Sequence, residues 1–321
     1  MSEELKQVLE REKAALLKLP NVVGVGIGHK RVGGKSTGQP SLIVLVKKKL
    51  PAAQLAAADL VPPRVGGVPT DVVEVGDIRA LGALPLPLGA ENNPRTRKMR
   101  PARPGVSIGH YKITAGTFGA VVYDRQSRAP LILSNNHVLA NSTSDRARRA
   151  SVGDPIWQPG RYDGGSSEDL IARLERFVPL HFRRLFFSPK AKRPNLVDAA
   201  VARPLTPQLI SDEIMELGRV QGIAEAQPDL EVTKSGRTTG VTSGRVIALH
   251  ASLDVGYDGG RQATFVEQVV AEPMSSGGDS GSLVLTRDLK AVGLLFAGSA
   301  QATIFSPIQT VLDLLDLDLM P

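Results

Sequence analysis

Residues 275–282 are Ser-Ser-Gly-Gly-Asp-Ser-Gly-Ser, and Ser280 in this stretch has glycines at positions 278 and 281. A serine hydroxyl is a weak nucleophile at neutral pH and needs a base beside it. It also needs main-chain N–H groups aimed at the oxygen that becomes negative during acyl transfer. The glycines allow a tight turn that would bring the N–H groups of Gly278 and Ser280 to one point. The stretch therefore predicts a nucleophile within an oxyanion hole, although an ordinary Gly/Ser-rich turn has the same composition.

An apolar strand that runs directly into a histidine is the second signal. The sequence is Leu133-Ser-Asn-Asn-His137-Val-Leu139, so apolar residues flank the imidazole on both sides. A histidine anchored in this way is suited to act as a general base. The other four histidines lack such a setting and are interpreted as surface or hydrogen-bonded residues.

A single carboxylate within an apolar run is the third signal. The run is Asn195-Leu-Val-Asp198-Ala-Ala-Val-Ala, which predicts a buried strand. Because a buried charge without a partner is costly, Asp198 needs a donor. The N–H of an imidazole would serve and would fix the tautomer of the ring. A structural aspartate bonded to main-chain amides is the alternative, and Asp154, Asp163 and Asp169 are rivals in predicted loops.

The three candidates occur in the order His137, Asp198, Ser280. That order is the chymotrypsin type, and it differs from the Asp-His-Ser order of subtilisin and the Ser-Asp-His order of the α/β-hydrolases. The α/β-hydrolase motif also has glycine where this chain has Ser282. We therefore predict a Ser-His-Asp triad made of Ser280, His137 and Asp198.

Short strand candidates with glycine-rich turns fill the chain from Gly105 onward, which predicts a β-sandwich or barrel. An apolar helical period over residues 3–19 and strand patterns over 22–28, 41–47 and 70–76 predict a small α+β accessory domain before it. The stretch between them is rich in proline and basic residues and predicts an exposed connection. The expected division is residues 1–82, 83–104 and 105–321.

Over residues 105–321 the chain resembles the trypsin-like, chymotrypsin-fold serine peptidases, through Gly278-Asp-Ser-Gly281 and Asn136-His137-Val138. Lys234-Ser-Gly-Arg-Thr-Thr-Gly240 resembles a segment of bacterial members. Together with Gly24-Val-Gly-Ile-Gly28 and residues 68–76, the whole chain looks most like the plant NARROW LEAF-type proteases and their bacterial relatives. The resemblance implies a mainly β fold with two six-stranded barrels, a triad in the cleft between them, and an N-terminal accessory domain.

The resemblance also carries expectations about activation and specificity. Many trypsin-like zymogens are activated when a freed N-terminal amine pairs with the aspartate before the nucleophile, here Asp279. No suitable new terminus follows the basic connection, so we predict an internal donor for Asp279 and a chain that is competent without cleavage. The substrate pocket is expected at Met274, Phe296 and Gly298, and since no aspartate lies there, we predict a preference for an apolar side chain.

Composition excludes several other classes of function. The chain has no cysteine, so disulfides, thiolate zinc sites and cysteine nucleophiles are excluded. The run Gly28-His-Lys-Arg-Val-Gly-Gly-Lys-Ser36 has the wrong spacing for a P-loop and precedes a strand instead of a helix. We therefore expect neither a cofactor nor a metal.

The net charge of +7 is concentrated in two local clusters, which we interpret as solvated loops instead of a nucleic-acid interface. The N-terminus lacks a secretory pattern and no apolar run is long enough to cross a bilayer, so we expect a cytoplasmic protein without membrane contact. A protein or peptide substrate is the expected partner. Two alternatives stay open: assembly of identical chains through the N-terminal region, and a protease-like module that binds or scaffolds proteins with little activity.

Overall fold

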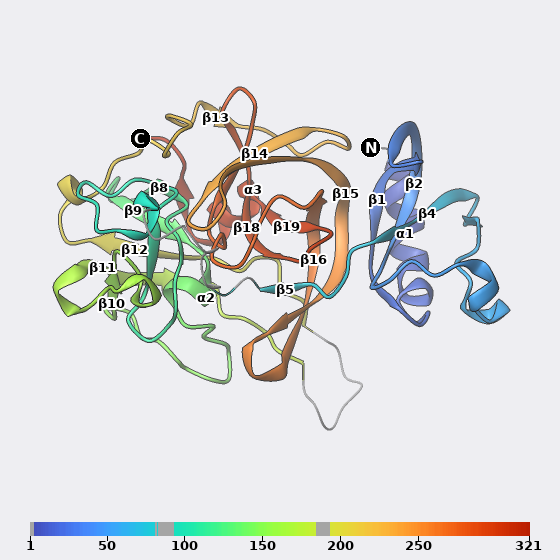
Figure 1. The fold of residues 1–321 in the computed structure, drawn as a ribbon, viewed down its shortest axis with the longest axis horizontal. Coiled ribbons are helices and arrows are strands. Elements are labelled where there is room, and N and C mark those ends of the chain that lie inside the picture. Colours follow the sequence, from blue (N-terminus) through green and yellow to red (C-terminus); the bar gives the residue numbers. More distant parts are fainter. Residues whose placement is uncertain (1–2, 81, 83–92, 184–192) are drawn as a thin grey trace.

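The structure is a computed structural model, and it describes residues 3–80, 82, 93–183 and 193–321. The chain is mainly β, and its strands form two curled sheets that pack as the chymotrypsin-like double barrel expected from the sequence. A smaller unit made of N-terminal residues lies at one end of the molecule, in blue in Figure 1. No helix among the described residues has the length and apolar character needed to span a bilayer.

The C-terminal barrel is a closed sheet. Its strands, in spatial order, are β14 (Glu231–Gly236), β17 (Leu283–Thr286), β18 (Lys290–Gly298), β19 (Thr303–Pro307), β16 (Arg261–Ala271) and β15 (Gly240–Tyr257). Pairing of β14 with β15 closes the ring. Phe265, Phe296 and Phe305 are fully buried, and their large apolar surfaces stabilise the packing of this sheet. The short strand β13 (Gly222–Ile223) adds to β18 in parallel.

The other barrel is formed by the central part of the chain. Its sheet has the order β20 (Leu317–Asp318), β8 (Ala120–Asp124), β9 (Pro130–Ser134), β12 (Ala200–Pro204), β11 (Leu170–Phe177), β10 (Pro155–Trp157), β6 (Ser107–His110) and β7 (Gly116–Thr117). Buried residues such as Ile108, Phe118 and Ile171 fill it. The 3₁₀ turns η5 (Arg161–Asp163) and η6 (Ser167–Asp169) lie between β10 and β11, and η7 (Pro207–Leu209) follows β12. In the C-terminal barrel, η8 (Asp258–Gly260) connects β15 to β16.

The C-terminal helix α3 (Ile308–Leu314) joins the two barrels. Ile308, Val311 and Leu312 belong to one buried cluster with Leu133 of β9 and Leu294 of β18. The helix begins after Pro307, which occupies the N-cap position without a side-chain cap. The hydroxyl of Ser306, the residue before it, donates to the Gln268 side chain.

The N-terminal unit is a curled sheet covered by a helix. It consists of α1 (Glu3–Leu16), β1 (Val22–Val32), β2 (Lys35–Val46), β3 (Arg64–Val65) and β4 (Val68–Glu74). Two 3₁₀ turns, η1 (Ala52–Gln54) and η2 (Ala57–Asp59), lie between β2 and β3. Leu5, Val8, Leu9 and Leu16 of α1 pack against Val25, Ile27, Leu42 and Val44. The apolar stripe of the helix is therefore covered by the chain's own sheet.

The N-terminal unit continues the sheet of the C-terminal barrel. β1 pairs antiparallel with the middle of β15, with Gly24 opposite Leu253 and Ile27 opposite Leu249. The glycines of β1 permit this approach, because a Cβ on Gly28 would lie 2.2 Å from the main-chain oxygen of Ile247. The boundary that the sequence suggests at residue 82 is therefore crossed by a strand ladder.

Residues 93–104, the described part of the expected connection, combine buried and exposed positions: Arg97, Lys98 and Arg103 are exposed, while Arg95 is buried. The 3₁₀ turn η4 (Pro94–Thr96) buries Arg95, whose guanidinium donates to the Gly105 carbonyl and the Ser235 hydroxyl and pairs with Glu216. Ala102 is fully buried as well. Residues 83–92 of the expected connection lie outside the described residues.

Candidate active site

His137 lies in the helical turn α2 (Asn136–Leu139), which follows β9 directly. The sequence pattern predicts it at the end of the apolar strand itself. Val138 and Leu139 are buried in the core. The amide of Asn136 donates to the carbonyls of Thr143 and Val178, and these bonds fix the start of the turn. The side chain of His137 is 9% exposed. A short polar segment anchored on both sides thus gives the imidazole one orientation.

Asp198 lies beside this imidazole, just before β12 and not within it as the apolar run suggests. Its Oδ2 is 2.7 Å from His137 Nδ1, and its Oδ1 accepts the main-chain N–H of His137 at 3.1 Å. The Asn135 amide donates to the Asp198 carbonyl at 2.7 Å and ties the two segments together. Since the buried carboxylate is an acceptor, Nδ1 carries the proton and Nε2 is left as the basic atom.

Tyr257, the last residue of β15, is a third donor to this carboxylate. Its hydroxyl lies 2.7 Å from Asp198 Oδ2, and its ring meets that of His137 edge-on at 6.1 Å. Burial, and then the charge of Asp198, raises the pKa of Tyr257 well above its ordinary value, so the phenol stays a donor. Sequence reasoning missed this residue because no spacing relates the end of a hairpin to a carboxylate 59 positions earlier.

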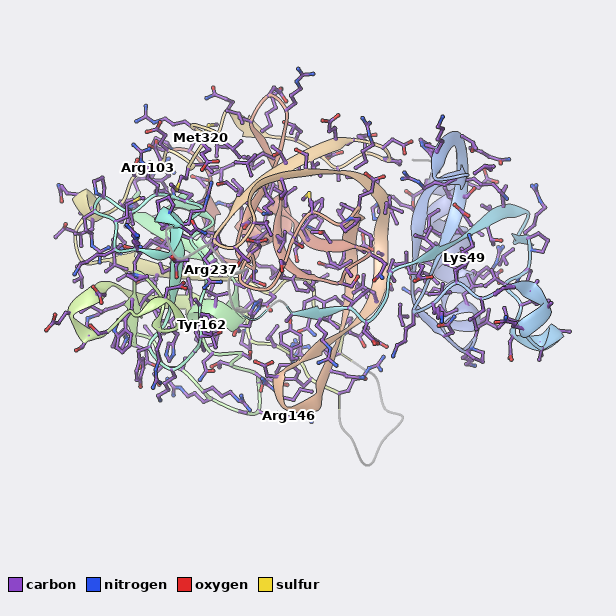
Figure 2. All side chains as sticks on the ribbon, in the orientation of Figure 1. Lys49, Arg103, Arg146, Tyr162, Arg237 and Met320 are labelled. Atoms are coloured by element: carbon purple, nitrogen blue, oxygen red, sulfur yellow. The ribbon has the colours of Figure 1, made fainter. Side chains whose placement is uncertain are left out.

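The rival residues have partners of their own. Asp154 pairs with His110 at 3.1 Å, Asp169 pairs with Lys98 at 2.8 Å, and Asp163 pairs with Arg237. Arg237 is fully buried, and its guanidinium lies 5.4 Å from the centre of the exposed Tyr162 ring (both are labelled in Figure 2). The remaining histidines, at positions 29, 181 and 250, also face carboxylates. Pairing with a carboxylate alone therefore does not distinguish His137 from the other histidines.

The loop that carries Ser280 is held by the aspartate before it. Asp279 is fully buried and accepts the main-chain N–H groups of Thr238, Thr239 and Ser276 at 2.8, 3.1 and 2.9 Å. The hydroxyl of Thr239 donates to it at 2.6 Å. Donors from two segments thus fix the conformation of the loop.

The ammonium group of Lys234 is the internal cation for Asp279. Its Nζ lies 3.3 Å from Asp279 Oδ2, and neither side chain is exposed. Desolvation lowers the pKa of Lys234, and the neighbouring carboxylate opposes this shift. The expectation of an internal donor for Asp279 is confirmed, and the segment 234–240 supplies both the ammonium and the main-chain amides.

Two glycines are required in the Ser280 loop. Gly278 has φ of +97° and Gly281 has φ of +96°, a backbone region that residues with a side chain rarely adopt. A Cβ at Gly281 would lie 2.1 Å from the Ser134 hydroxyl, and one at Gly278 would lie 2.4 Å from the Thr238 hydroxyl. Among the described residues, the main-chain N–H groups of Gly278 and Ser280 have no hydrogen-bond acceptor, which leaves them available to an oxyanion.

Ser280 is brought to the same region but is not bonded to His137. Its hydroxyl donates to the Phe296 carbonyl at 3.1 Å, and its own carbonyl accepts the N–H of Thr117 at 2.8 Å. Its exposed fraction is 0%. His137 Nε2 is buried and finds no partner within the described ranges. The structure thus joins His137 to Asp198 and leaves the serine hydroxyl turned toward β18.

The three residues expected to form the substrate pocket lie in different surroundings. Met274 packs in a buried cluster of the C-terminal barrel, and Phe296 packs in the interior with its ring 4.6 Å from that of Phe265. Gly298 faces Arg79 of the short strand β5 (Arg79–Ala80). The specificity that we expect from these positions stays a prediction.

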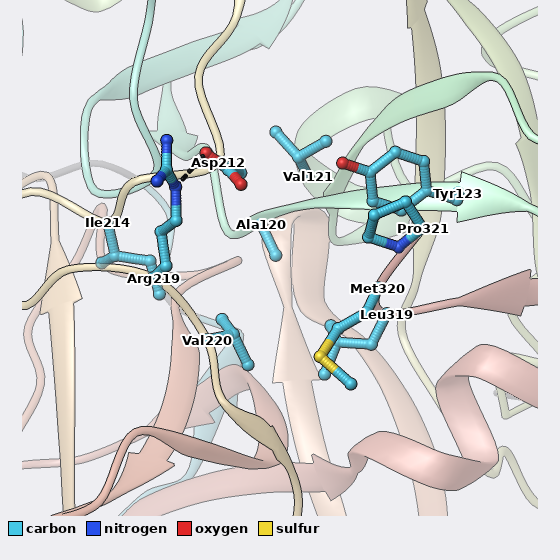
Figure 3. A pocket seen from close by; sticks show the side chains of 10 residues that line it. All are labelled: Ala120, Val121, Tyr123, Asp212, Ile214, Arg219, Val220, Leu319, Met320 and Pro321. Carbon is cyan, nitrogen blue, oxygen red and sulfur yellow. Dashed lines mark hydrogen bonds and ion pairs between the residues drawn. The ribbon is translucent and has the colours of Figure 1, made fainter.

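A cavity of about 190 Å³ adjoins the imidazole, with His137, Ala115, Tyr257, Arg149, Arg261 and Ala80 in its wall. A second cavity, of about 150 Å³, lies near the C-terminus and contains none of the candidate triad (Figure 3). Its rim carries an ion pair between Arg219 and Asp212 at 2.9 Å. In the part of the chain that the structure describes, no three His, Asp or Glu side chains are grouped to hold a metal ion.

No family model matches this chain, and no curated protein sequence matches it. Similar solved structures exist. They are chymotrypsin-fold serine proteases. Thermobifida fusca protease A is 19% identical, over 68% of this chain and 99% of its own, with a TM-score of 0.47. A glutamic-acid-specific serine protease is 18% identical, over 68% of this chain and 100% of its own, with a TM-score of 0.47. The active form of the Rv3671c protease from M. tuberculosis is 16% identical, over 73% of this chain and 89% of its own, with a TM-score of 0.38.

Proposed function

We propose that this protein is a serine endopeptidase that cleaves peptide bonds through an acyl-enzyme on Ser280. The observation that carries the proposal is the buried pair of His137 and Asp198, with 2.7 Å between Nδ1 and Oδ2 and with no partner for Nε2 among the described residues. A structural ion pair needs no basic nitrogen left without a hydrogen bond, because a buried polar atom without a partner costs free energy. A general base needs that nitrogen.

The proposed chemistry follows from these groups. The hydroxyl oxygen of Ser280 attacks the substrate carbonyl while its proton passes to His137 Nε2, and Asp198 stabilises the imidazolium that forms. The imidazolium then gives the proton to the departing amine, which leaves an ester on Ser280. Water attacks this ester with the same base, releasing the acid and restoring the hydroxyl.

In both steps, the main-chain N–H groups of Gly278 and Ser280 donate hydrogen bonds to the oxyanion. These donors belong to a loop fixed by Asp279, so they need no reorganisation when charge develops. The first step requires rotation of the Ser280 hydroxyl from the Phe296 carbonyl toward His137. A staggered side-chain rotation of a serine is a small change compared with refolding a loop.

Labelling with a fluorophosphonate tests the proposal. The reagent phosphonylates a serine only where a base activates it, so the full-length chain should be labelled and Ser280→Ala should not. His137→Ala should lose the labelling too, and the double variant should be no worse than either single variant. Equal labelling of the chain and Ser280→Ala would contradict the proposal and would leave the binding or scaffolding module as the alternative.

Substrate class and setting extend the same proposal. We propose protein or peptide substrates with an apolar side chain before the cleaved bond. Cleavage rates of peptides with Leu, Phe or Arg at that position test this preference, and the Leu and Phe peptides should be cleaved faster. Kinship with the NARROW LEAF-type proteases and a cytoplasmic location are likewise proposals. Intact mass of an active preparation tests whether the chain works uncleaved, and activity found only after cutting within 95–106 would contradict it.

A further inference from the structure

A short strand from the N-terminal part of the chain lies against the edge of the C-terminal barrel. In β5, Ala80 is paired with Ala297 and Arg79 with Gly298, antiparallel to β18. Arg79 is also paired with Gly256 at the end of β15, in parallel. The strand thus bridges the ends of two strands at the junction of the barrels, below the centre of Figure 1.

The residues that precede β5 fasten it in place. Val75 and Ile78 are buried in the core cluster of the C-terminal barrel. The hydroxyl of Ser299 donates to the Val75 carbonyl at 2.5 Å, and the N–H of Gly256 donates to the Ile78 carbonyl at 3.0 Å. The pairing of β5 is therefore supported by buried side chains and hydrogen bonds of the residues directly before it.

β5 lies next to the candidate catalytic groups. β18 carries Phe296, the residue directly before Ala297, and the Phe296 carbonyl holds the Ser280 hydroxyl. Ala80 and Gly82 line the cavity that contains His137 and Tyr257. Ser280 is 0% exposed in this arrangement, yet a substrate carbonyl must come within about 3.5 Å of the attacking oxygen.

We propose that β5 occupies the edge of β18 at which an extended peptide substrate adds as a strand, so that the chain competes with its own substrates. This inference rests on the proposed function. An exposed sheet edge binds extended peptides through main-chain hydrogen bonds, and only one strand can pair with Ala297 and Gly298 on this side of β18 at a time. The competitor is covalently attached, so its effective concentration is independent of the concentration of the protein.

The catalytic loop is already formed while β5 is bound. Asp279 has its ammonium partner Lys234 and its main-chain donors in the full-length chain. Inhibition by β5 therefore acts on access and not on the assembly of the oxyanion hole. Such a competitor raises the apparent KM and leaves kcat unchanged, because substrate in excess displaces it.

Substitution of Arg79 by proline tests this proposal. The side chain of Arg79 is exposed, while proline removes its main-chain N–H, which a strand needs for pairing. Arg79→Ala is the matched control, because it removes the same side chain and keeps the N–H. With an apolar peptide substrate, Arg79→Pro should lower KM roughly fivefold or more with kcat within about twofold, and Arg79→Ala should match the wild-type chain.

A peptide with the sequence of residues 75–80 gives a second measurement. It should inhibit Arg79→Pro competitively and should have less effect on the wild-type chain, whose edge is already filled. If Arg79→Pro does not fold, Ser299→Ala loosens the same segment, and a KM lower than that of the wild-type chain is the expected result.

The outcomes separate the two proposals. Labelling of Ser280 in every variant together with an unchanged KM and no inhibition by the peptide would overturn the role of β5 and leave the peptidase intact. Absence of Ser280 labelling in the wild-type chain and in Arg79→Pro alike would overturn the peptidase, and the role of β5 with it.

Discussion

Replacement of Tyr257 by phenylalanine isolates the contribution of one hydroxyl to the candidate triad. The ring packs against Phe265, Phe182 and His137, and phenylalanine keeps these contacts. Only the bond to Asp198 Oδ2 is lost, and the two bonds from His137 stay. The variant therefore weakens the positioning of the Asp198 carboxylate and leaves His137, Asp198 and Ser280 unchanged.

The magnitude follows from the kind of bond. A hydrogen bond to a charged group contributes about 1.5–3 kcal/mol net. Because Asp198 retains two other donors, the lower part of this range applies. A loss of about 1.5–2 kcal/mol of transition-state stabilisation lowers the rate roughly 10- to 30-fold.

The rate of fluorophosphonate labelling measures this loss without knowledge of the substrate, and kcat and KM for an apolar peptide complete the test. We expect kcat to fall and KM to stay within about twofold, because a loosely held base affects the chemical step. Tyr123→Phe, at a tyrosine in the second cavity, which contains none of the candidate triad, is the control and should behave like the wild-type chain. A labelling rate of Tyr257→Phe within about twofold of the wild-type chain, while Asp198→Asn collapses, would refute the positioning role.

Three further predictions concern the loop, its cation and a buried histidine. Lys234→Met leaves Asp279 buried without its cation and should lower the free energy of unfolding in urea by about 3 kcal/mol, with Lys234→Met/Asp279→Asn recovering part of the loss. Gly281→Ala should abolish labelling and lower the melting temperature, while Gly33→Ala, at a positive φ with open space around it, should keep full labelling. Burial lowers the pKa of His110 below 6.5, so the unfolded chain takes up a proton there before the folded chain does. Stability should therefore fall as the pH drops below about 6.5, by at most about 1.4 kcal/mol per unit, and His110→Gln should flatten this part of the curve.

The sequence predicted the fold class and the pairing of His137 with Asp198, because both leave local signals. Alternating apolar residues mark strands, and a lone carboxylate in an apolar run demands a donor. An internal donor for Asp279 was predicted from the resemblance to trypsin-like peptidases, in which a freed amine pairs with the aspartate at this position. The identity of this donor as Lys234 was not predicted, because the pairing depends on how β14 lies against the Ser280 loop.

The features that the sequence did not predict depend on contacts between distant segments. Tyr257 reaches Asp198 only because β15 is long enough to bring its end to the triad. Arg95 belongs to a proline-rich, basic stretch that is typical of exposed chain, but Ser235 and Glu216 offer it partners in the fold. The orientation of the Ser280 hydroxyl toward Phe296 is also a property of the packed structure, because no motif encodes a rotamer.

The ladder between β1 and β15 has a consequence for dissecting the molecule. A shortened chain that begins at residue 105 would lack β1 and β5. β15 would then have an unpaired edge where it now pairs with residues 24–28, and β18 would have one where it now pairs with Arg79 and Ala80. Unpaired edges recruit strands from other molecules. Expression of the two barrels alone should therefore yield aggregates, and a soluble, uninhibited form is better sought by weakening one strand within the intact chain.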